Sequence, residues 1–132
     1  MAMAAGRPSR EGEAATERVR AICLGLPEVT ERPSHGEAAF FVGGKRCFAS
    51  MSDHHHDDRV ALLLAAGEGV QRDLVTRLPG RYFRPAYVGG RGWVGAYLDG
   101  AGAAGPDWDE IAELAADAWL LVAPARLRPL LG

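Results

Sequence analysis

The chain has 132 residues, 48% of them hydrophobic and 24% charged, with a formal net charge of −2 at neutral pH. This size and composition predict one domain with its own core, and they exclude both a disordered protein and one that coats nucleic acid by charge alone. No apolar run reaches the roughly 18 residues of a membrane span, so no membrane partner is expected.

Two features bear on where the protein acts. Residues 1–16 lack the apolar segment of a secretory signal. The two cysteines, Cys23 and Cys47, are too few for a disulfide framework, and both fall at positions expected to be buried. We therefore expect a cytoplasmic protein.

The first half of the chain predicts a helix followed by a hairpin. Residues 1–12 are small, polar and charged, which predicts a flexible tail before a domain over residues 13–132. From Glu13 onward apolar side chains recur at helical spacing until Gly25 and Pro27 end the helix. Strands over residues 38–42 and 45–51 then flank Gly43-Gly44, which predicts a hairpin turn.

The second half predicts a third strand, a short helix and two more strands, over residues 59–65, 67–78, 82–88 and 92–98. Asp107 can cap a final helix, Glu110 completes a capping-box-like pair, and Pro124 stops it. Hairpins with segregated helices predict an α+β fold. We expect a single-domain sandwich in which an antiparallel sheet of about five strands is covered on one face by the N- and C-terminal helices.

The sheet face without helices is the first candidate for function. On the last strand, Val94, Ala96 and Leu98 suit the helix side, which leaves Trp93 and Tyr97 outward. On the returning strand of the hairpin, Cys47, Ala49 and Met51 suit the core, which leaves Arg46 and Phe48 outward. Aromatic side chains beside arginines suit stacking on bases or on a planar ligand. The alternative is that a loop or a dimer partner covers these aromatics.

Charge is distributed unevenly along the chain. Residues 72–91 contain five arginines and one acid, a local charge of +4, whereas residues 99–117 contain six acids and no base. The first region can bind phosphates. The alternative is that the two regions neutralise each other through surface pairs of little energetic worth.

The clusters that suggest metal or catalytic chemistry are weak. His54, His56 and Asp58 could ligate a transition metal, but no further ligand stands at a recognisable spacing, so a solvated loop, no metal and no cofactor are expected. A catalytic thiol would need a placed histidine, for which His35 is the candidate. We expect no enzyme activity, because an enzyme would need a buried pocket with His35 beside an acid or Cys47.

Several segments resemble the MmcQ/YjbR family in their order and spacing. They are Leu26–Glu31 (LPEVTE), Ser34–Gly36 (SHG), Phe40–Phe48 (FFVGGKRCF), Tyr87–Gly95 (YVGGRGWVG) and Ala118–Leu127 (AWLLVAPARL). The resemblance covers about residues 14–127 and implies a helix–sheet–helix sandwich similar to the bacterial frataxin homologue CyaY. It also implies DNA binding through a "double wing" of hairpins, with Lys45, Arg91 and Trp93 at positions typical of the family.

This chain departs from the family at two basic positions. Relatives often have Tyr-Arg near Trp119-Leu120, and Pro-Lys-Arg where this chain has Pro124-Ala125-Arg126. The missing cations imply weak, salt-dependent DNA binding. The apolar Trp119-Leu120 could instead belong to a dimer contact or a ligand pocket.

Two functions are therefore expected for a non-catalytic binding protein, acting as a monomer or a homodimer. In the first, Lys45, Arg46, Arg84 and Arg91 meet DNA phosphates while Trp93 and Tyr97 stack on bases. In the alternative, the protein binds or sequesters a small aromatic compound. Its candidate ligand-binding residues are His35, Phe48, Trp93, Tyr97 and Trp119.

Overall fold

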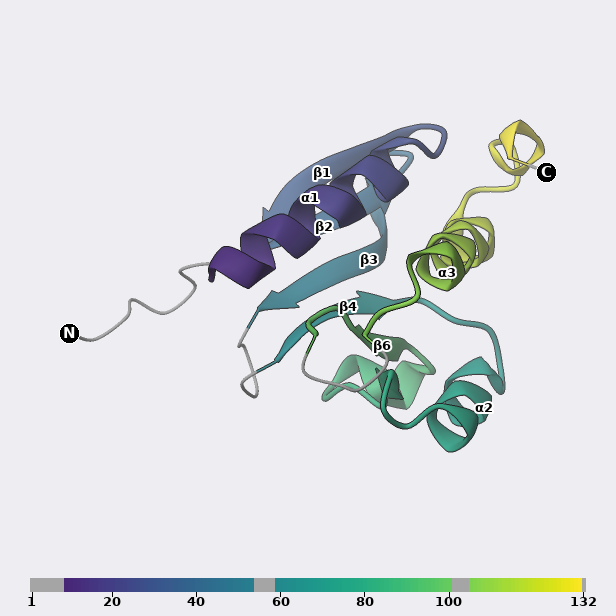
Figure 1. Cartoon of the computed structure of the whole chain (residues 1–132). Coiled ribbons are helices and arrows are strands. Elements are labelled where there is room, and N and C mark those ends of the chain that lie inside the picture. The colour runs from purple at the N-terminus through teal and green to yellow at the C-terminus, as the bar shows by residue number, and fades with distance from the viewer. Residues whose placement is uncertain (1–8, 54–58, 101–104, 132) are drawn as a thin grey trace.

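The computed structural model describes residues 9–53, 59–100 and 105–131 (Figure 1). Its strands form one antiparallel sheet in the order β1-β2-β3-β4-β6-β5. The strands are β1 (Val29–Ser34), β2 (Glu37–Val42), β3 (Arg46–Asp53), β4 (Val60–Leu64), β5 (Tyr82–Phe83) and β6 (Val94–Tyr97). The predicted α+β sandwich is confirmed, with six strands in place of about five.

Two long helices cover one face of this sheet, and a shorter one packs against β5 at its edge. The helices are α1 (Arg10–Leu24), α2 (Val70–Arg77) and α3 (Trp108–Val122), with 3-10 turns η1 (Val88–Arg91) and η2 (Arg128–Leu130). None of the helices in the described part of the chain has both the length and the hydropathy of a membrane span.

Helix α1 begins earlier than expected because its cap is held by a distant strand. The Ser9 hydroxyl accepts a hydrogen bond from the Gly12 N–H at 2.8 Å, and the Ser9 N–H donates to the Asp53 carboxylate at 2.7 Å. Such a cap stabilises a helix start. The expectation of a flexible tail through residue 12 is wrong for residues 10–12, which belong to α1, while residues 1–8 lie outside the described chain.

Strand β1 is the strand that the sequence did not predict. It pairs with β2 alone and so forms one edge of the sheet. Pro33 has no backbone N–H to donate, and an edge strand tolerates this because no further strand of the described chain lies beside it. The charged Glu31 and Arg32 lie on the same strand. Charges and a proline are typical of edge strands, because they discourage pairing with another chain.

A bulge in β3 corrects the expected direction of Phe48. Phe40 pairs with Ala49 while the next residue, Phe41, pairs with Cys47, so Phe48 is an extra residue opposite the β2 register shift. The strand therefore buries Phe48 and Ala49 in succession, and Cys47 moves to the opposite face. The prediction that Phe48 points outward and Cys47 inward is wrong.

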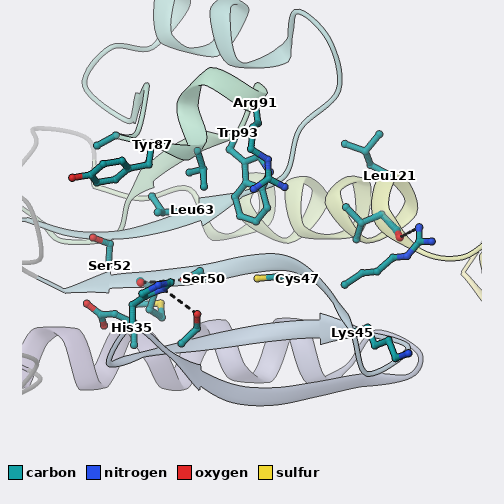
Figure 2. Close-up of a pocket in the computed structure, with 17 residues that line it drawn as sticks. His35, Lys45, Cys47, Ser50, Ser52, Leu63, Tyr87, Arg91, Trp93 and Leu121 are labelled. Carbon is teal, nitrogen blue, oxygen red and sulfur yellow. Dashed lines mark hydrogen bonds between the residues drawn. The ribbon is translucent and has the colours of Figure 1, made fainter.

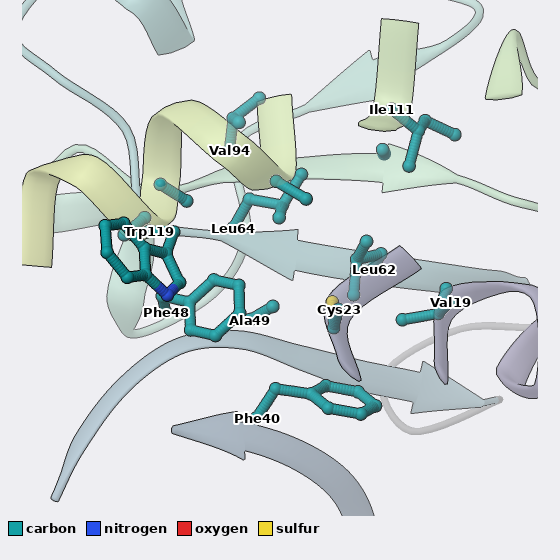
Figure 3. Packing of buried hydrophobic residues seen from close by; sticks show 14 of the residues in the cluster. Val19, Cys23, Phe40, Phe48, Ala49, Leu62, Leu64, Val94, Ile111 and Trp119 are labelled. Atoms are coloured by element: carbon teal, nitrogen blue, oxygen red, sulfur yellow. The ribbon is translucent and has the colours of Figure 1, made fainter. Parts of the chain in front are cut away.

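The core between the helices and the sheet contains Phe40, Phe48 and Trp119 (Figure 3). Trp119 on α3 is 0% exposed, and its indole Nε1–H donates to the Pro27 carbonyl at 2.8 Å. This bond links α3 to the segment between α1 and β1 and satisfies the one polar atom of the side chain. Trp119 is therefore a core residue, and its expected place in a ligand pocket or a dimer contact is wrong.

We expect Trp119→Phe to lower the free energy of unfolding by about 2–4 kcal/mol, because it leaves the Pro27 carbonyl without its donor and leaves a void. Chemical denaturation followed by circular dichroism measures this. Trp108→Phe is the matched control, since Trp108 is half-buried with the Arg18 guanidinium 4.5 Å over its ring. An equal loss in both variants would contradict the assigned role of Trp119.

Candidate ligand-binding groove

The sheet face opposite α1 and α3 carries a groove of about 880 Å³, which we call the open-face groove. Its floor is the outer side of β3 and β4, and the segment 86–93 forms one wall (Figure 2). The end of α3 and the β2–β3 turn lie at one end of the groove, and the turn between β1 and β2 lies at the other.

The floor is built by strand alternation. Ser50 on β3 pairs with Leu63 on β4, and both side chains line the groove. Their neighbours Ala49 and Leu64, which also pair, face the helices and are fully buried. Because alternate strand residues point to the same side, Ser52 also reaches the groove, and the bulge at Phe48 brings Cys47 to that side as well. The floor is thus apolar, with thiol and hydroxyl groups at intervals.

The wall departs from the expected strand over residues 82–88. Strand β5 ends at Phe83, and the Val88 N–H donates to the Ala86 carbonyl at 2.7 Å, which closes a γ-turn centred on Tyr87. Tyr87 has φ 63° and ψ −73°, a strained conformation for a residue with a side chain. The turn leaves Tyr87 87% exposed at the groove margin. No pattern in the sequence predicts this residue as part of a site.

A glutamine on α2 holds the other end of the wall. The Gln71 side-chain amide donates to the Gly89 carbonyl at 2.9 Å and to the Trp93 carbonyl at 2.6 Å. Gln71 therefore fixes the two ends of the η1 turn relative to each other, and it ties the wall to a helix rather than to the strands alone.

Cations gather toward one end of the groove. The Arg91 guanidinium lies 5.7 Å from the centre of the Trp93 ring, within the range of a cation–π contact. Arg46 donates from Nη1 to the Val122 carbonyl at 3.1 Å, and Lys45 is exposed on the β2–β3 turn. These three residues line the groove together with the apolar Leu121 of α3.

The opposite end is polar. Ser34, His35 and Glu37 line it from the β1–β2 turn, where His35 and Gly36 both have positive φ, as in the type I′ turns that join tight hairpins. The His35 ring nitrogen Nδ1 lies 3.2 Å from the Ser34 hydroxyl. The open-face groove thus offers hydrogen-bonding groups at one end and positive charge at the other.

The remaining predicted site residues lie elsewhere. Trp93 lines the groove but is only 8% exposed, so little of its ring is open for stacking. Tyr97 points to the open face as predicted, yet Phe83 stacks on it at 4.6 Å and the Arg59 guanidinium covers it at 3.8 Å. Arg84 lines a second, neighbouring groove.

The predicted histidine cluster, His54–His56, lies outside the described residues. Within residues 9–53, 59–100 and 105–131, no three histidine, cysteine or acidic side chains come together as a metal site would need.

Comparisons with known proteins agree with this architecture. The YjbR family model matches residues 24–121. The crystal structure of Deinococcus radiodurans protein DR2400, with domain DUF419, is similar with a TM-score of 0.69 and 22% sequence identity, over 89% of this chain and 87% of that one. At this identity the likeness shows the fold. No curated protein matches the chain.

The two thiols differ in their environment. Both are free, and Cys23 is fully buried on the core side of α1, where burial raises the pKa of its thiol to about 12. Burial also raises the pKa of Cys47, which is only partly buried on the groove floor, and its Sγ donates weakly to the Ala49 carbonyl at 3.5 Å. A thiol that stays protonated is a poor nucleophile.

We expect alkylation by iodoacetamide to modify Cys47 and leave Cys23 intact in the folded protein, because only Cys47 reaches the groove. Since its pKa is raised, the Cys47 rate should keep rising above the pH at which an ordinary thiol levels off. Mass spectrometry against pH measures both sites, and the unfolded chain gives the reference rates. Equal rates for the two folded-state thiols would contradict this assignment.

Proposed function

Because the chain belongs to the YjbR family and carries the open-face groove, we propose that it binds a small organic molecule with an apolar body and a negative charge. The observation that carries the proposal is the groove itself. Its volume of about 880 Å³ lies in the range that drug-sized ligands occupy, and its lining combines an apolar floor with a few polar groups.

The charges of the groove favour an anion. Arg91, Lys45 and Arg46 stand toward one end, and Glu37 is the one acid that lines the groove among the described residues. A carboxylate or sulfonate near Arg91 would receive charge-assisted hydrogen bonds, while an aromatic or aliphatic body would lie on Leu63 and against Val88.

Binding without chemistry is the form that we propose. The Cys47 thiol has a raised pKa, and His35 is exposed on a turn with its ring beside Ser34, so neither is placed as an activated nucleophile or its base. A cytoplasmic location stays a prediction from the cysteine usage.

The aromatic anion 8-anilinonaphthalene-1-sulfonate is a suitable probe. We expect saturable fluorescence enhancement at one site and at least about tenfold weaker binding in Leu63→Glu, because a carboxylate on the floor repels the sulfonate and opposes burial of the rings. Leu130→Glu, at an exposed leucine outside the groove, is the matched control.

The same probe should slow the alkylation of Cys47 in the unmodified chain, which tests the site without a substitution. Unsaturable enhancement, or unchanged Cys47 alkylation at saturation, would refute binding in the open-face groove.

DNA binding is the second candidate, and the exposure of Lys45, Arg46, Arg84 and Arg91 favours it. The stacking part of that hypothesis has less support, because Trp93 is nearly buried and Tyr97 is covered by Phe83 and Arg59. The form that we propose is therefore weak attraction of phosphates to exposed cations, without base stacking.

If these four cations contact phosphates, log K should fall against log salt with a slope of about −3.6 for a duplex of about 20 base pairs. Fluorescence anisotropy at increasing salt measures the slope. The double variant Lys45→Gln/Arg91→Gln should flatten it, whereas Arg10→Gln/Arg126→Gln, at exposed arginines that line neither groove, should not. No binding at low salt would remove this candidate.

A further inference from the structure

A second groove, of about 570 Å³, lies beside the η1 turn and is lined by three exposed arginines. Arg72 comes from α2, Arg84 from the segment after β5, and Arg91 from η1. Among the described residues, the one acid in this lining is Glu68. We call this the arginine groove.

Across the described ranges, the three arginines of the arginine groove lack the acidic partners that several other arginines of this protein have. Arg20, Arg59 and Arg77 each form an ion pair, with Glu31, Asp99 and Asp73 respectively. Within the part of the chain that the structure describes, Arg72, Arg84 and Arg91 form neither an ion pair nor a hydrogen bond to a protein acceptor. Like charges that share a recess repel each other, and an anion between them relieves that repulsion.

The turn holds two of these arginines in place. A Cβ at Gly89 would lie 2.8 Å from the Arg84 Cγ, so the absence of a side chain lets the Arg84 stem lie across the turn. A Cβ at Gly90 would lie 4.0 Å from the Arg84 Nη2, which places that guanidinium over the turn. Arg91 is oriented by the Trp93 ring, and Gln71 clamps the turn beneath both. Such positioning lowers the entropy lost on binding.

We propose that the arginine groove binds the phosphate group of a small phosphorylated molecule. Guanidinium forks match phosphate oxygens in pairs, and three arginines that line one groove suit a group with several anionic oxygens. The recess favours a terminal phosphate that can enter it over the backbone of a duplex. This site is distinct from the open-face groove, although Arg91 lines both.

Sodium pyrophosphate is the probe for this proposal. In an NMR titration of the labelled protein at low ionic strength, we expect saturable shifts of the backbone amides of Gly89, Gly90 and Gly92 and of the Gln71 side-chain amide. Calorimetry should show that Arg72→Gln and Arg84→Gln each weaken binding by about tenfold, since each removes a charge-assisted contact. Arg126→Gln, an exposed arginine outside the groove, should leave the affinity unchanged.

Three results would overturn the proposal: shifts that do not saturate, shifts centred away from the η1 turn, or equal weakening by Arg126→Gln. A short DNA duplex is the second arm of the experiment. If the duplex saturates these amides and pyrophosphate does not, the phosphate belongs to nucleic acid and the small-ligand proposal fails. Arg91 is left unchanged in these variants, so a failure here is separate from a failure of the open-face groove.

Discussion

Strand β4 imposes the constraint on which the functional surface depends, because both of its sides need cover while the helices cover only one. Leu62 and Leu64 are buried beneath the helices. On the opposite side, Ala61 pairs with Tyr97 and Leu63 with Gly95, and both need apolar neighbours there. The segment 86–93 supplies part of that cover over Leu63. It stops short of β3, and the uncovered remainder is the open-face groove.

The parts of this architecture that local signals encode could be predicted from the sequence. The Asp107 carboxylate accepts from the Glu110 N–H at 3.1 Å, which is the cap that the spacing indicated. Val94, Ala96 and Leu98 are buried on the helix side, as strict alternation requires. The sequence predicts these elements correctly because each signal lies within a few residues of the structure that it indicates.

The groove could not be predicted, because the residues that shape it depend on distant partners. The bulge that turns Cys47 outward and Phe48 inward comes from a register shift against β2. The wall depends on Gln71, a residue of α2 that binds two carbonyls about 20 positions away in the chain. The strained turn at Tyr87 has no sequence signature, since positive φ is expected of glycine and asparagine rather than tyrosine.

The close approach of β5 and β6 on the open face has a consequence for how this protein can diverge. A Cβ at Gly95 would overlap the ring of Phe83, which lies directly over that glycine and stacks on Tyr97. We therefore expect substitutions at the two positions to be coupled. A relative with any side chain in place of Gly95 must carry a smaller residue in place of Phe83, or it must move the strand edge that leads into the wall. Correlated substitution at these two positions would mark the lineages in which the groove has changed shape.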